Sequence, residues 1–84
     1  MAVVHRSIQL HPSYEVQAMK NTIREERLQR QLTQAQLAEL VSVTRQTIFS
    51  IETNKYIPSV VLSLKLAKAF GRSVEKLFQL ETSD

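Results

Sequence analysis

The chain has 84 residues, of which 43% are hydrophobic and 23% are charged, and this fits one small globular domain with little room for an enclosed active site. It contains no Cys, which excludes disulfides and thiolate metal sites, and it has no apolar run long enough to span a membrane. Its formal net charge of +3 suits a polyanionic partner, although charge alone does not identify one. Because the N-terminus lacks the pattern of an export signal, we expect a cytoplasmic protein.

Residues 1–18 differ from the rest of the chain in their sequence pattern, because their hydrophobic residues show no sustained helical period. Alternation over 3–10 permits a short strand, and this leaves two interpretations open: a loose arm, or a strand that pairs with its counterpart in a second chain. The two His residues, His5 and His11, have no other ligand near them, so no metal site is predicted. We therefore expect an irregular N-terminal arm over 1–18 and a folded domain over 19–84.

Two helices are predicted in the first half of that domain. The first covers about 20–30 and is expected to turn Ile23, Arg27 and Leu28 inward. The second covers 34–41 and follows a capping box, in which Thr33 is the N-cap and Gln36 lies three residues later. The residues that the second helix is expected to bury are Leu37, Ala38 and Val41.

Three further helices complete the chain. The third covers 45–53 behind the cap residue Thr44, after a turn made by Ser42 and Val43. The fourth follows Pro58 and Ser59 and runs to Phe70, with Gly71 suited to a left-handed conformation just after it. Leu62, Leu66 and Phe70 are expected to face the core, and a last helix capped by Ser73 carries Val74, Leu77 and Phe78. These five short helices predict an all-α fold.

The third helix has two contrasting faces. A helical wheel places Ile48, Ile51 and Glu52 on one side and the polar or aromatic residues Gln46, Phe49, Ser50 and Thr53 on the other, while Arg45 projects from the first turn. The outer side has no carboxylate. Arg can donate two hydrogen bonds to guanine, and Gln can form a bidentate pair with adenine, so this side suits the major groove of DNA. Phe49 either rests against thymine methyl groups or packs against a partner subunit or a neighbouring loop.

The run LTQAQLAELVSVTRQTIFSIETNKYIPS, residues 32–59, closely resembles the Cro/phage-repressor (Xre-like) helix-turn-helix family, in particular its short stand-alone members. The resemblance extends over about 19–80, roughly three quarters of the chain. It implies a five-helix lambda-repressor-like DNA-binding domain. Where family members commonly have Gly after helices, this chain has Gln31, Ser42 and Asn54, so we expect those turns to be slightly reshaped.

The resemblance also implies roles for individual residues. The position of Gln34 contacts DNA at the start of the second helix. Positions that read bases correspond to Arg45, Gln46, Phe49 and Ser50, and those close to phosphates correspond to Thr44, Thr47 and Lys55. In the family an Arg of the first helix often pairs with a Glu that ends the third, and here these residues are Arg27 and Glu52.

The function that the resemblance implies is sequence-specific regulation of transcription, with double-stranded DNA as the partner. We expect a homodimer on a palindromic operator, with the recognition helix at 45–53. The sequence suggests neither an enzyme nor a cofactor, because it has no nucleophile with a base and no phosphate-binding Gly loop. The alternative is a protein-interaction module, such as the antitoxin of a toxin–antitoxin pair, whose working surfaces would be the 1–18 arm and the pair Val60–Val61.

Overall fold

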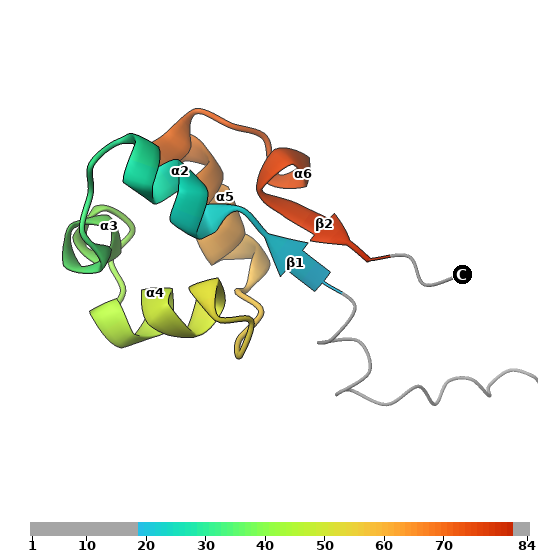
Figure 1. Ribbon diagram of the computed structural model, residues 1–84, viewed down its shortest axis with the longest axis horizontal. Coiled ribbons are helices and arrows are strands. Elements are labelled where there is room, and N and C mark those ends of the chain that lie inside the picture. Colours follow the sequence, from blue (N-terminus) through green and yellow to red (C-terminus); the bar gives the residue numbers. More distant parts are fainter. Residues whose placement is uncertain (1–18, 82–84) are drawn as a thin grey trace, which may run out of the picture.

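A computed structural model of the protein describes residues 19–81, and the expectations for the 1–18 arm lie outside this range. Within it, five helices and two short strands follow one another (Figure 1). In chain order these are β1 (Met19–Asn21), α2 (Ile23–Gln29), α3 (Gln34–Leu40), α4 (Arg45–Glu52), α5 (Val60–Phe70), α6 (Val74–Leu77) and β2 (Phe78–Leu80). The prediction of a helical domain with five helices is confirmed. No helix of the described range is long and apolar enough to cross a membrane.

The two strands correct the expected beginning of the first helix and the expected end of the last. β1 and β2 pair antiparallel, with Met19 opposite Leu80 and Asn21 opposite Phe78, so the segment at 20–21 is not helical and Phe78 is not in a helix. The side chain of Asn21 accepts a hydrogen bond from the backbone N–H of Ile23 at 3.0 Å, and α2 begins there. The pairing joins the two ends of the domain, and local periodicity contains no signal for such a contact.

Four helices begin where the cap residues were predicted. In each case the hydroxyl of the residue before the helix accepts a hydrogen bond from a backbone N–H in the first turn, which otherwise has no partner. The pairs are Thr33 with Gln36, Thr44 with Thr47, Ser59 with Leu62, and Ser73 with Lys76. At α3 the Gln36 side chain also accepts from the Thr33 N–H at 2.8 Å, which completes the predicted capping box.

Four helix ends share one geometry. At each of them a residue in the left-handed region follows the helix, with φ of 58° at Gln31, 62° at Ser42, 60° at Asn54 and 66° at Gly71. The next N–H then donates to the carbonyl five residues back, as in the Schellman motif. These bonds are Leu32 to Arg27, Val43 to Ala38, Lys55 to Ser50 and Arg72 to Ala67. Three of these turns keep the form that favours Gly without having one, so the expectation that the turns at Gln31, Ser42 and Asn54 are reshaped is wrong.

The core lies where the five helices meet and contains most of the residues that periodicity assigned to it. Its buried hydrophobic side chains are Ile23, Leu37, Ala38, Val41, Ile48, Ile51, Leu62, Leu66, Ala67, Phe70 and Leu77. Leu28 was also expected to face inward, but its side chain is 49% exposed. The buried face of α2 is centred on Ile23 and Arg27, and Leu28 points about 100° away from Arg27 around the helix axis.

Candidate nucleic-acid interface

The pair α3 and α4 forms a helix-turn-helix unit whose inner side is fixed by the core. Leu37 and Ala38 of α3 and Ile48 and Ile51 of α4 are all buried in the same hydrophobic cluster. The short connection is held by the N–H of Val43, which donates to the Ala38 carbonyl at 2.9 Å. Because the inner side of α4 is anchored in this way, its opposite side faces solvent with a defined orientation.

The outer side of α4 carries the residues predicted to read bases. Arg45, Gln46 and Phe49 are exposed, and Ser50 is half-buried beside them. Phe49 keeps 37% of its surface accessible, so its ring is open to a partner on one side while the rest lies against the protein. The structure therefore brings these four side chains onto one surface.

A further aromatic residue, which the sequence analysis did not single out, belongs to this surface. Tyr56 lines an open pocket of about 230 Å³ together with Gln46, Thr47 and Ser50. Its side chain is 44% exposed. Tyr56 lies beyond the end of α4 and is brought back against the helix by the left-handed turn at Asn54. Because Tyr56 lies outside α4, the helical periodicity of α4 could not predict that its side chain lies on this surface.

The residues predicted to lie near phosphates have structural partners of their own. The hydroxyl of Thr44 caps α4 and lies 3.0 Å from the hydroxyl of Thr47. Lys55 is exposed just after α4, and its N–H donates to the Ser50 carbonyl at 2.8 Å. Gln34 is half-buried at the start of α3, where its Nε2 donates to Oε1 of Glu52 at 3.1 Å. Thr44 and Lys55 are exposed on either side of α4, and Thr47 is half-buried in its first turn.

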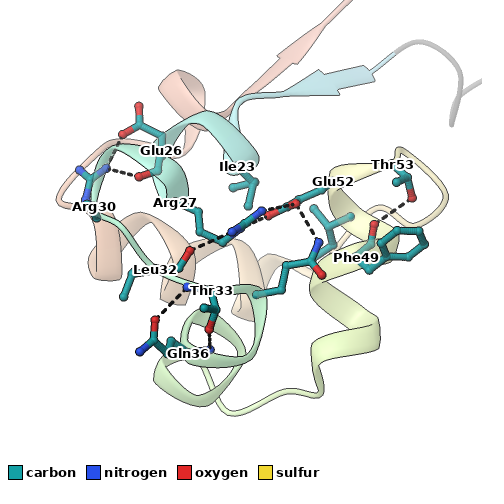
Figure 2. A network of polar contacts seen from close by, with 12 residues as sticks. Ile23, Glu26, Arg27, Arg30, Leu32, Thr33, Gln36, Phe49, Glu52 and Thr53 are labelled. Atoms are coloured by element: carbon teal, nitrogen blue, oxygen red, sulfur yellow. Dashed lines mark hydrogen bonds and ion pairs between the residues drawn. The ribbon is translucent and has the colours of Figure 1, made fainter.

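A buried ion pair links α2 to the end of α4 (Figure 2). Arg27 donates from Nε to Oε2 of Glu52 at 2.7 Å and from Nη2 to Oε1 at 3.1 Å. Its Nη1 donates to the Leu32 carbonyl at 2.8 Å, in the turn before α3. The side chains of Arg27 and Glu52 are only 9% and 2% exposed. One guanidinium thus ties α2, the turn before α3 and α4 together, and such a bidentate pair fixes orientation as well as distance.

The charges around α4 and α5 are almost all positive. Between residues 40 and 74 the only carboxylate is Glu52, which is paired with Arg27. The same stretch contains the cations Arg45, Lys55, Lys65, Lys68 and Arg72, of which Arg72 is paired with Glu26 at 3.3 Å. Exposed cations attract polyanions, so Arg45 and Lys55, at the two ends of α4, favour a partner such as DNA. Among residues 19–81 no group of acidic or His side chains is placed to hold a metal ion.

Comparison with known proteins gives a consistent result. The family model described as Helix-turn-helix matches residues 23–77. The uncharacterized HTH-type transcriptional regulator YgzD of Bacillus subtilis is 46% identical over 63 residues, which are 75% of this chain and 96% of that protein. An uncharacterized HTH-type transcriptional regulator of Methanothermobacter thermautotrophicus is 47% identical over 64 residues, which are 75% of this chain and 93% of that protein.

A solved structure is similar as well. The restriction-modification controller protein C.AhdI from Aeromonas hydrophila superposes with a TM-score of 0.60 at 31% sequence identity. The match covers 64% of this chain and 78% of that one. The fold of the matched part is therefore shared with a protein of related sequence.

Proposed function

This chain belongs to the helix-turn-helix family of DNA-binding transcriptional regulators, and from that premise we propose that it reads operator DNA through the outer side of α4. The observation that carries the proposal is the anchoring of α4. Its inner side is held by Ile48 and Ile51, and its last residue, Glu52, is fixed by Arg27. A rigid helix with an accessible polar side is what entry into a major groove requires.

The base-reading roles follow from the chemistry of the exposed side chains. Arg45 projects from the first turn of α4, where a guanidinium can donate two hydrogen bonds to guanine O6 and N7. The amide of Gln46 matches adenine N6 and N7. Ser50 can donate or accept, and the exposed part of Phe49 suits a thymine methyl group. These assignments make Arg45 and Gln46 the main determinants of specificity.

Contacts to the phosphate backbone would set the position of α4 in the groove. We assign them to Thr44, Thr47 and Lys55, which border α4, and to Gln34, which begins α3. One N–H of the Gln34 amide is bonded to Glu52, so its oxygen and second N–H remain for DNA. Such contacts orient a protein on the duplex without carrying sequence information.

A single α4 is too short to read a long site. Eight residues of helix span about 12 Å, whereas one turn of the duplex spans about 34 Å. We therefore assign the protein a two-fold homodimer on a palindromic operator, with half-sites about 10 bp apart centre to centre. A regulator of this kind acts where the chromosome is, and we place it in the cytoplasm.

Selection from a random duplex pool tests the proposal. The full chain would be incubated with the pool, bound duplexes amplified, and the recovered sequences measured individually at several salt concentrations. We expect an inverted repeat that binds at least 1000-fold more tightly than random DNA, the lower end of the range for specific regulators. Binding that depends steeply on salt but enriches no sequence would contradict sequence reading.

The protein-interaction alternative has one observation in its favour, the exposure of Val60 and Val61, at 75% and 63%. An antitoxin would co-purify with a second protein encoded beside it. If the chain purifies alone from its native host and still binds the operator, the result supports a regulator that needs no such protein partner. A stable complex that masks operator binding would favour the antitoxin.

A further inference from the structure

The side chain of Asn21 joins the start of the domain to the end of the DNA-reading helix. Asn21 is the last residue of β1, and its Nδ2 donates to the carbonyl of Ile51 at 3.0 Å and to Oδ1 of Asn54 at 3.2 Å. Its Oδ1 accepts from the N–H of Ile23, the first residue of α2, at 3.0 Å. One half-buried amide thus uses both of its ends, and its Nδ2 reaches partners 30 and 33 positions later in the chain.

The segment that Asn21 holds is the turn that follows α4. We call residues 53–56 the α4 turn. Asn54 adopts the left-handed conformation there, with φ of 60°, and the N–H of Lys55 then donates to the Ser50 carbonyl at 2.8 Å. All four residues of the turn are exposed. A helix end with so little buried surface opens readily unless further bonds hold it.

In the part of the chain that the structure describes, Asn21 makes the only side-chain hydrogen bond between the α4 turn and another element. The hydroxyl of Thr53 bonds within its own helix end, to the carbonyl of Phe49 at 2.8 Å (Figure 2). Arg27 fixes Glu52 from the other direction, but that ion pair precedes the turn. Asn21 is therefore the polar link between the α4 turn itself and the rest of the domain.

Asn21 is itself firmly held. Its backbone lies opposite Phe78 in the ribbon of β1 and β2, and Phe78 packs against the hydrophobic core. The N–H of the next residue, Thr22, donates to the carbonyl of the buried Leu77 at 3.0 Å. Because the base of the Asn21 side chain is fixed in this way, its bonds to the α4 turn restrict the turn and lower the number of conformations open to it.

We propose that Asn21 is a positioning residue for DNA binding, which holds the α4 turn so that Lys55 is already in place for a phosphate, an inference that rests on the proposed DNA-binding function. Lys55 directly follows Asn54, so it moves with the residue that Asn21 holds. A contact from a segment that is ordered in advance avoids the entropy that a mobile segment loses on binding. Since phosphate contacts carry no sequence information, Asn21 raises the affinity for all duplexes by one factor.

The two ends of the Asn21 amide allow a variant that separates their roles. Asn21→Ser keeps a hydroxyl that can accept from the Ile23 N–H two residues later, but it is too short to reach Ile51 or Asn54. Gln79→Ser is the matched control, because it removes a half-buried amide of β2 that bonds to carbonyls of α6 and not to α4. Circular dichroism would check that both variants fold. If Asn21→Ser does not, Asn21→Asp replaces it in the experiment without DNA, since its carboxylate keeps an oxygen for Ile23.

Amide hydrogen exchange without DNA, followed by NMR, tests whether Asn21 holds the turn. The N–H groups of Lys55 and Arg72 close turns of the same geometry, at 2.8 and 3.0 Å, and both residues are exposed, but only the first turn is bonded to Asn21. We expect Asn21→Ser to speed exchange at Lys55 about fivefold relative to Arg72, a typical effect of losing one hydrogen bond. Gln79→Ser should leave the ratio of the two rates as it is in the parent. An unchanged ratio in Asn21→Ser, or an equal change in Gln79→Ser, overturns the inference.

Affinities for the selected operator and for a scrambled duplex test the step from the turn to DNA. Asn21→Ser should weaken both by the same factor, roughly two- to tenfold, which is the range of one hydrogen bond. The double variant Asn21→Ser, Lys55→Ala should bind as Lys55→Ala does, because Asn21 then has no phosphate contact to support. Losses that add in full, or a loss confined to the operator, overturn the inference. A parent that binds no duplex would instead refute the proposed function, and with it any role of the turn on DNA, even where the exchange rates change as expected.

Discussion

Gln34 and Glu52 are joined by a hydrogen bond of 3.1 Å, from the Gln34 amide to Oε1 of the carboxylate. This bond connects the first residue of α3 to the last residue of α4. The same oxygen also accepts from Arg27, so a residue assigned to DNA and a buried structural pair share one acceptor. The position of Gln34 on the DNA-facing side therefore depends on the ion pair behind it.

Removal of Arg27 should destabilise the fold strongly. Arg27→Met leaves the Glu52 carboxylate buried without its cation, and loss of one member of a buried pair costs about 3–5 kcal/mol of unfolding free energy. Urea denaturation measures the loss, and Arg24→Met, a change at an exposed position of the same helix, is the control. The double variant Arg27→Met, Glu52→Met should lose less than Arg27→Met alone. Equal stability of Arg27→Met and the control would show that the pair has no structural role.

Arg45 and Lys55 should differ in the kind of loss that they cause. Arg45→Ala removes a base contact, so it should weaken binding to the selected operator by about 1–3 kcal/mol and relax the preference at one base pair. Lys55→Ala removes a phosphate contact, so it should weaken all duplexes alike and lower the slope of log K against log salt by about 1. Fluorescence anisotropy with operator and scrambled duplexes distinguishes them. If Arg45→Ala binds both duplexes as the parent does, α4 does not read bases through this residue.

The left-handed turns should respond in opposite directions to Gly and Ala. Gln31→Gly and Ser42→Gly relieve the strain of a side chain at positive φ and should stabilise the protein by up to about 1 kcal/mol each. Gly71→Ala should destabilise it by about 1 kcal/mol, and strain alone is responsible, since no atom lies within 4 Å of the added Cβ. Thermal unfolding gives the three values. Destabilisation by both Gly variants would mean that lost chain entropy outweighs the strain.

Acid should remove the contribution of Glu26. The hydrogen bond from Arg30, at 2.7 Å, lowers the pKa of Glu26 below its ordinary value, and Arg72 lowers it further. A carboxyl with a lowered pKa stabilises the fold above its unfolded-state pKa, about 4.3, and this contribution is lost as the pH falls through the folded-state value.

The change that tests this is Glu26→Gln. It should lower the unfolding free energy by at most about 1 kcal/mol at pH 7, because such pairs near the surface are weak, and by nothing once the parent carboxyl is protonated. Denaturation in a pH series from 7 down to 2 follows this difference, with the exposed neighbour in Glu25→Gln as the control. A difference that does not shrink at any pH of the series would show that hydrogen bonding by the neutral side chain is responsible.

Much of this protein was determined by the sequence on its own, because the signals are local. Each helix start depends on a hydroxyl and an N–H a few residues apart, as at Thr33, Thr44, Ser59 and Ser73. The buried faces repeat every three or four residues, so the inward side of α4 and the outward position of Gln46 and Ser50 follow from the pattern.

Other features were decided only when distant segments met. β1 pairs with β2 across the length of the domain, and the Asn21 amide donates to the carbonyl of Ile51 at 3.0 Å, at the end of α4. Tyr56 lines the pocket beside α4, and Gln34 bonds to Glu52, through other tertiary contacts. Periodicity reports which side of an element is buried but not what it is buried against, since that depends on how the whole chain packs.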